Sequence, residues 1–143
     1  MIDYFSAAKA AIISKLQGLT KVNTNFIFGY EKGELGGYPA ITITGQEYYA
    51  KYGDTCSDAE TYVFELKIWQ ERGDVDKGLK TASQTETIID DALVEVMQSL
   101  QQDFTLGGVI DKMELSATKF YSDREIMMRG AFIKITCSKL NPL

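Results

Sequence analysis

The strongest constraint on the fold is a segment near the middle of the chain in which apolar and polar side chains alternate. Between Ala59 and Gln70, one series of alternate residues is large and apolar: Tyr62, Phe64, Leu66 and Ile68. A period of two places these side chains on one face of a β-strand. The other series, which includes Glu65 and Lys67, is more polar. The segment therefore predicts a strand with one face buried against a core.

Similar alternation before and after this strand predicts two hairpins. Pro39 opens a strand over residues 40–52, and the turn at residues 53–58 joins it to the strand at 59–70. A second hairpin is expected from strands at 109–121 and 125–139, with residues 140–143 as a short tail. The inward residues expected in its last strand are Met127, Ala131, Ile133, Ile135 and Cys137. A short buried strand is also expected at residues 26–30.

Two segments show helical periodicity. Residues 2–19 carry apolar residues at three- and four-residue spacing, and residues 20–25 form a polar connection. A longer helix is expected from about Asp74, a suitable N-cap, to about Gln101. Its inward stripe is Val75, Leu79, Ala82, Ile89, Leu93, Val96 and Leu100, supported by Ala92 and Met97.

These elements predict an α+β fold in the order α-β-β-β-α-β-β. Hairpins dominate the β part, so the sheet is expected to be mainly antiparallel, with two helices packed on one face. The chain has 143 residues, of which 45% are hydrophobic and 24% are charged. This length and composition suit one globular domain, expected to span residues 1–143.

Charge and hydropathy limit the expected partners. The net charge is −5 and the basic residues are scattered, so no specific nucleic-acid binding is expected, although DNA can pass such a surface without sticking. No segment approaches the roughly 20 apolar residues that span a bilayer, and the N-terminus lacks the positive flank of a secretory signal. We therefore expect the protein to be made in a cytoplasm and not to associate with a membrane.

No complete catalytic motif is found in the sequence. The chain contains no histidine, the commonest general base near neutral pH. Ser6 and Lys9 match S-x-x-K by letter, but the companion motifs of that enzyme class are missing, so both are interpreted as solvent-facing. Residues 74–78 begin like a calcium loop, but Thr85 stands where its final glutamate would be, which favours helix capping.

Three further groups have simpler structural interpretations. Gly33, Gly36 and Gly37 lead into a strand rather than a helix N-terminus, which favours a loop over a phosphate cradle. Glu86, Asp90 and Asp91 are interpreted as a solvated helix face; metal or ligand binding by these carboxylates is the alternative. Cys56 and Cys137 are expected to be free thiols. No cofactor and no metal are expected.

The first hairpin is the best candidate for a contact surface. Its distal end is both aromatic and polar, and all of these side chains cannot fold back onto one small core. Tyrosine is enriched in protein interfaces, which favours a protein contact over the stacking of nucleic-acid bases. The candidate interface residues are Tyr48, Tyr49, Lys51 and Tyr52 of the hairpin, with Glu34 and Leu35 of the glycine-containing loop at 31–38.

Three segments carry a resemblance to a known family. They are the strand start at residues 37–43, the strand at 62–70 that feeds the long helix, and the turn Asp-Phe-Thr-Leu-Gly-Gly-Val at 103–109. Together with the element order over almost the whole chain, they resemble the tail-terminator (tail-completion, tail-to-head joining) proteins of long-tailed bacteriophages.

This resemblance implies a non-enzymatic virion protein that forms a hexameric ring. Such a ring caps the tail tube and offers a docking surface to the head–tail connector protein. Its partners would be other copies of the chain, the tail-tube protein and the connector. Its location would be the tail or neck of the virion, after assembly in the host cytoplasm. Two alternatives remain: a head-closure, neck or minor capsid protein of similar plan, and a small carboxylate-based enzyme or ligand-binding domain.

Overall fold

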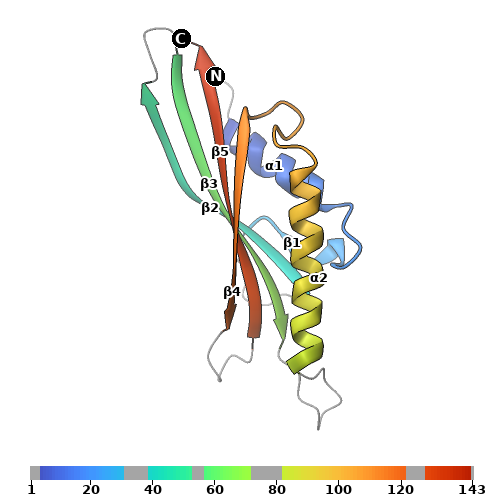
Figure 1. Cartoon of the computed structure of the whole chain (residues 1–143). Coiled ribbons are helices and arrows are strands. Elements are labelled where there is room, and N and C mark those ends of the chain that lie inside the picture. The colour runs from blue at the N-terminus through green and yellow to red at the C-terminus, as the bar shows by residue number, and fades with distance from the viewer. Residues whose placement is uncertain (1–3, 31–38, 53–56, 72–81, 122–127, 143) are drawn as a thin grey trace.

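The computed structural model describes residues 4–30, 39–52, 57–71, 82–121 and 128–142. A five-stranded sheet carries two helices on one face, and the long strands twist strongly across it (Figure 1). In chain order the elements are α1 (Tyr4–Leu16), the 3₁₀ turn η1 (Thr24–Phe26), β1 (Ile27–Phe28), β2 (Ala40–Tyr52), β3 (Ser57–Glu71), α2 (Ala82–Gln101), β4 (Lys112–Tyr121) and β5 (Met128–Pro142). The order α-β-β-β-α-β-β and the mainly antiparallel sheet confirm the predicted fold class.

The strand order in the sheet is β1-β2-β3-β5-β4. The two hairpin pairs, β2 with β3 and β4 with β5, are antiparallel, and β5 joins them by pairing antiparallel with β3 along its whole length. Among the described strands, only β1 is parallel to its neighbour, and it pairs with Ile41 and Thr42 of β2. The pairing of β2 with β3 shifts between Gly45 and Glu47, which marks a β-bulge.

The core lies between the sheet and the two helices. From the sheet it takes the alternating residues that the sequence pattern predicts: Tyr62, Phe64, Leu66 and Ile68 of β3 and Ile133, Ile135 and Cys137 of β5 are fully buried. The helices supply Ala8, Ile12 and Leu16 from α1 and Ala92, Val96 and Leu100 from α2. At about 25 cal/mol per Å² of apolar surface, burial of such side chains is the main stabilising contribution.

The two strands predicted for the first hairpin are confirmed as β2 and β3, although β3 begins at Ser57, inside the predicted turn, and two details elsewhere are wrong. Residues 140–142 of the predicted tail are part of β5, because β3 pairs with β5 along its whole length and Ser57 of β3 lies opposite Pro142. Strand β4 begins at Lys112, since the residues before it form a turn.

The first helix and strand are shorter than the sequence pattern predicts. Helix α1 ends at Leu16 and a turn follows. Phe26 belongs to η1 because the Asn23 side chain caps that turn, accepting a hydrogen bond from the Asn25 N–H at 2.9 Å. Only Ile27 and Phe28 remain as strand, and both are half-buried. Residues 75–81 of the predicted second helix, with Val75 and Leu79, lie outside the described residues, as do Met127 and the Asp74–Gly78 segment.

Candidate assembly surface

The predicted contact residues of the first hairpin lie in the distal half of β2. Tyr48 is 54% exposed and stands opposite Tyr62 of β3. Tyr49, Lys51 and Tyr52 continue the strand, opposite Thr61, Ala59 and Asp58; nothing is described of their side chains. Glu34 and Leu35 lie outside the described residues, as do Gly33, Gly36 and Gly37. The structure thus places the four hairpin residues on one strand and leaves the loop residues untested.

Tyr48 belongs to an aromatic cluster that joins the hairpin to α1. The Phe5 ring stacks on Phe64 with centroids 5.1 Å apart and meets Tyr48 and Tyr62 edge-on at 5.7 and 5.8 Å. Aromatic pairs of this geometry each contribute about 0.5–1.5 kcal/mol beyond area burial. The expectation that the hairpin aromatics project away from the core is therefore only partly right for Tyr48, whose ring also packs on the helix.

Gly45 makes room for this cluster. A Cβ atom placed on Gly45 would lie 2.4 Å from Cζ of Phe5, so a side chain here and the Phe5 ring compete for one space. A glycine inside a strand pattern is a known signal of a bulge or of close approach. Gly45 lies at the bulge in β2, so a glycine within a strand pattern is the sequence signal for this contact.

The two long edges of the sheet are open in the described part of the chain. Along β2, residues 45–48 are all exposed, and along β4, residues 116–119 are all exposed. Successive residues of a strand point to opposite faces, so both faces of these segments are uncovered. The strand order leaves their edges unpaired within the described residues, because β1 pairs only with Ile41 and Thr42 of β2 and β4 is the last strand. Exposed strand edges are templates for pairing with another chain, and charged residues and bulges restrict what they accept.

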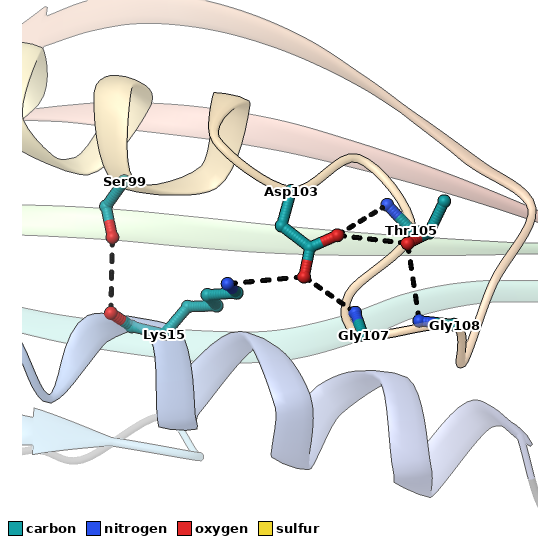
Figure 2. A network of polar contacts seen from close by, with 6 residues as sticks. All are labelled: Lys15, Ser99, Asp103, Thr105, Gly107 and Gly108. Carbon is teal, nitrogen blue, oxygen red and sulfur yellow. Dashed lines mark hydrogen bonds and ion pairs between the residues drawn. The ribbon is translucent and has the colours of Figure 1, made fainter.

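A network of polar contacts joins the C-terminal end of α1 to the C-terminal end of α2. Figure 2 shows Asp103, just after α2, accepting hydrogen bonds from the Thr105 N–H and hydroxyl and from the Gly107 N–H, the last at 2.7 Å. Lys15 of α1 reaches the same carboxylate at 3.2 Å, and Ser99 of α2 donates to the Lys15 carbonyl oxygen. The Thr105 hydrogen bond, ahead of the other contacts, lowers the pKa of Asp103.

This junction explains the Asp-Phe-Thr-Leu-Gly-Gly-Val sequence in structural terms. Leu106 is buried at a φ of 51°, and Gly107 and Gly108 follow at 72° and 92°. Glycine adopts left-handed backbone angles more readily than any other residue, which accounts for Gly107 and Gly108 at the last two of these three positions. The segment therefore forms a turn between α2 and β4, and its polar side chains and glycines stabilise the backbone of that turn.

A second carboxylate ties α2 to the connection after α1. Glu95 accepts hydrogen bonds from the Thr20 N–H at 2.8 Å, the Thr20 hydroxyl at 2.6 Å and the Lys21 N–H at 2.8 Å. Partial burial alone would raise the pKa of Glu95, but these hydrogen bonds outweigh it and the pKa is lowered. A groove of about 320 Å³ beside this pair is lined by the ends of the helices, including Gly18 and Gln98.

Two of the three acidic residues expected on a solvated face of α2 form ion pairs across to the sheet. Lys119 of β4 contacts Glu86 at 2.7 Å and also pairs with Asp90. The hydrogen bonds that the Lys119 ammonium donates to Asp90 and Glu86 raise the pKa of Lys119. Within the described residues, no group of three or more His, Cys, Asp or Glu could hold a metal ion. Glu86 and Asp90 are thus not a simple solvated face, because they clamp the edge strand β4 to α2.

The face of the sheet opposite the helices is mixed in character. Trp69 donates a hydrogen bond from Nε1 to the Thr42 hydroxyl at 3.0 Å, and the Lys67 ammonium lies 5.6 Å from the centre of the Trp69 ring. A hollow of about 140 Å³ beside Val63 and Phe132 is smaller than the roughly 300–1,000 Å³ of most ligand pockets. This face is better suited to contact a surface than to enclose a small molecule.

Two remaining predictions concern Cys137 and membrane spanning. Cys137 is buried with a free thiol, and burial raises its pKa to about 12, so the reactive thiolate is scarce near neutral pH. Cys56 lies outside the described residues. Of the helices in the described ranges, none combines the length and apolar character needed to cross a bilayer.

Comparison with known proteins gives a fold relationship. No protein-family model matches the chain, and a search of curated proteins found no match. Among solved structures, the chain is similar to a component of the virion of a native gene transfer agent (GTA) particle, with a TM-score of 0.53 and 8% sequence identity. The match covers 97% of this chain and 100% of the other, so the two share their fold from end to end.

Proposed function

We propose that this protein is a structural component of a phage-like virion and forms the ring that closes the tail tube and receives the head connector. The observation that carries the proposal is the full-length match to a chain of a gene transfer agent virion. Fold similarity alone does not fix function, so the surface of the molecule has to support the same role.

The surface supports assembly through protein contacts. Two strand edges are open along the described part of the sheet, and Tyr48 is more than half exposed beside one of them. The polar groups that could have suggested chemistry are used internally: Asp103 and Glu95 hold the helix ends, and Lys119 bridges β4 to α2. A non-enzymatic role, with no cofactor, is the simplest account of these contacts.

The proposed ring is a hexamer built from head-to-tail contacts between unlike surfaces. Heterologous contacts that close by rotation produce rings, and each subunit then presents one copy of two different surfaces. The tail-tube protein would bind one side of the ring and the connector the other. The net charge of −5 would let DNA pass through the ring without adhering to its wall.

Tail length tests this proposal against the related role of a head-closure or neck subunit. Particles assembled without the protein should carry overlong or unterminated tails, visible by electron microscopy. Complementation with the intact chain should restore tail length. Tails of normal length that fail to join heads would instead support the head-closure role. Fully normal particles would contradict both roles.

A further inference from the structure

We propose that the part of β2 that β1 leaves unpaired is a docking site for β4 of a second copy of this chain, in the antiparallel register that sets Tyr48 opposite Ala117 and Glu47 opposite Thr118. This inference rests on the proposed ring and names the contact that would build it. Both strands belong to the same five-stranded sheet (Figure 1).

The unpaired lengths of the two strands match. Strand β1 pairs with Ile41 and Thr42 of β2, and the described residues include no other strand on that side of β2 from Ile43 to Tyr52. Ten of the 13 residues of β2 lie beyond Thr42, and β4, the last strand at the other edge, also has ten. A second copy can therefore fill the free stretch and leave β1 in place.

Strand direction fits this docking. From β2 through β3 and β5 to β4, each strand pairs antiparallel with the next, so β2 and β4 run in opposite directions. A second copy in the same orientation therefore brings its β4 beside β2 with the antiparallel alternation unbroken. Copies in a ring share one orientation relative to the axis, which is the arrangement that this pairing needs.

The pairing within one sheet gives a reference level for the register between copies. Glu114 of β4 pairs with Thr136 of β5, and Thr136 pairs with Val63 of β3. Val63 pairs with Glu47 of β2, so Glu47 and Glu114 stand at one height on opposite sides of the sheet. Because side chains alternate between the two faces, a neighbouring copy keeps each face continuous when its offset from this level is an even number of residues.

An offset of four residues is the smallest that clears β1. With no offset or an offset of two, the end of β4 would face Thr42, with which β1 already pairs. An offset of four sets Tyr121, the last residue of β4, opposite Ile43, the first residue beyond β1. The same offset sets Thr118 opposite Glu47. Larger offsets shorten the overlap between the two strands.

This register brings the exposed parts of the two strands together. Residues 45–48 of β2 would lie opposite residues 117–119 of β4, and all of them are exposed. Gln46 would be skipped in the new pairing as it is in the pairing with β3, so the bulge suits both neighbours. Helix α1 packs on β2, whereas α2 packs on β3 and β5, which leaves space beside the exposed part of β4.

The opposed side chains are complementary on both faces of the sheet. On the helix side, the Tyr48 ring, which is 54% exposed, would cover the small exposed side chain of Ala117. On the other side, the hydroxyl of Thr118 can donate a hydrogen bond to the carboxylate of Glu47. Aromatic and polar cross-strand pairs of this kind are the unit of sheet stabilisation.

The same offset suits a closed ring. Each copy contributes four long strands, and each contact advances the pairing by four residues. With strands about 4.8 Å apart and a rise of about 3.3 Å per residue, this offset tilts the strands by about 35° from the ring axis. Strands in closed barrels tilt by about 35–45°, so the joined sheets can curve into a ring.

Disulfide cross-linking tests the register. Glu47→Cys and Thr118→Cys are combined in a Cys56→Ser background, with the buried Cys137 retained. Directly opposite residues have Cα atoms about 4.5–5.5 Å apart, within the roughly 4.4–6.8 Å that a disulfide bridges. Within one chain, three strand spacings, about 14 Å, separate the two strands, so this bond can form only between copies.

The matched control combines Glu47→Cys with Ser116→Cys in the same background. Ser116 is also exposed on β4 and shares a face with Thr118, but in the proposed register its Cα lies about 7–8 Å from that of Glu47, beyond disulfide reach. After oxidation, the Glu47–Thr118 variant should give covalent oligomers at about ten times the yield of the control or more. Non-reducing gels measure the yield. Mass photometry before oxidation and circular dichroism check that both variants assemble and fold.

The other outcomes separate this contact from the proposed function. Rings that form in the Glu47–Thr118 variant without cross-linking on oxidation would overturn the edge contact and leave the proposed ring intact. Equal or greater cross-linking of the control would overturn the register. Variants that no longer form rings even with tail tubes, while the wild type does, would place these residues in the contact. A wild-type chain that never forms rings, even with tail tubes, would refute the proposed function and this contact with it.

Discussion

Replacement of Gly45 by alanine tests how α1 is seated on the sheet. The new Cβ would lie 2.4 Å from Cζ of Phe5 and 3.2 and 3.4 Å from two other ring carbons, whereas carbon atoms prefer separations of about 3.5–4.0 Å. The ring would have to move by about 1 Å, away from its stacked position on Phe64. Overpacking of this kind costs about 1–3 kcal/mol, and the lower chain entropy of alanine offsets about 0.4–1 kcal/mol.

The expected net loss is therefore about 1–2 kcal/mol, equivalent to a fall in melting temperature of about 3–6 °C. Gly18→Ala is the matched control, because a Cβ at Gly18 meets no atom within 4 Å. Urea and thermal unfolding by circular dichroism measure both variants. The cost of Gly45→Ala should shrink in a Phe5→Ala background, where the ring is absent. An unchanged cost in that background, or no cost in the wild type, would refute this description of the contact.

Three further predictions concern the core, a carboxylate and a thiol. Leu100→Ala should lower the free energy of unfolding by about 2–5 kcal/mol in urea titrations, because Leu100 is fully buried, whereas the exposed Val94→Ala should change it little. Glu95→Gln should be less stable than wild type at pH 7. Because the pKa of Glu95 is lowered in the folded state, the difference should shrink as the pH falls through that folded-state pKa. A difference that stays constant throughout an acid titration would contradict the hydrogen-bond account. In a Cys56→Ser variant, Cys137 should react with a thiol reagent only when the protein unfolds, because its thiol is buried and its pKa is raised to about 12. Rapid labelling of the native protein would contradict this burial.

The central hairpin is predicted well from the sequence because the residues that alternate in the sequence are the same residues that are buried in the structure. Tyr62, Phe64, Leu66 and Ile68 alternate over a buried face, and the chain between Ala40 and Tyr52 contains no competing helical signal. Helix α2 is predicted for a similar reason, since Ile89, Val96 and Leu100 recur at helical spacing and are buried. Local pattern and tertiary packing favour the same structure in these segments.

The errors occur where a partner distant in sequence decides the structure. The end of β5 is extended by pairing with the start of β3, which a local reading of residues 140–143 cannot show. The start of β4 is delayed because Val109 and Ile110 pack against the core before the strand begins, although their alternation fits a strand. Thr85 is also fully buried although its polarity gives no such signal.

The candidate site is predicted only in part. Aromatic composition pointed to the strand that carries Tyr48, but the openness of its edge depends on β1 being only two residues long. The position of β4 at the far edge follows from the strand order β1-β2-β3-β5-β4, which depends on pairing between segments distant in sequence. Likewise, the partner of Glu86 and Asp90 is Lys119, a residue of another element that helix periodicity cannot identify.

Electron microscopy of the purified protein, alone and mixed with tail tubes, tests the central claim most directly. The account predicts rings of six subunits, either free in solution or seated at one end of each tube. Mass photometry of the same samples should give a species of six times the chain mass. A protein that stays monomeric at all concentrations and never binds the tube ends would contradict the account.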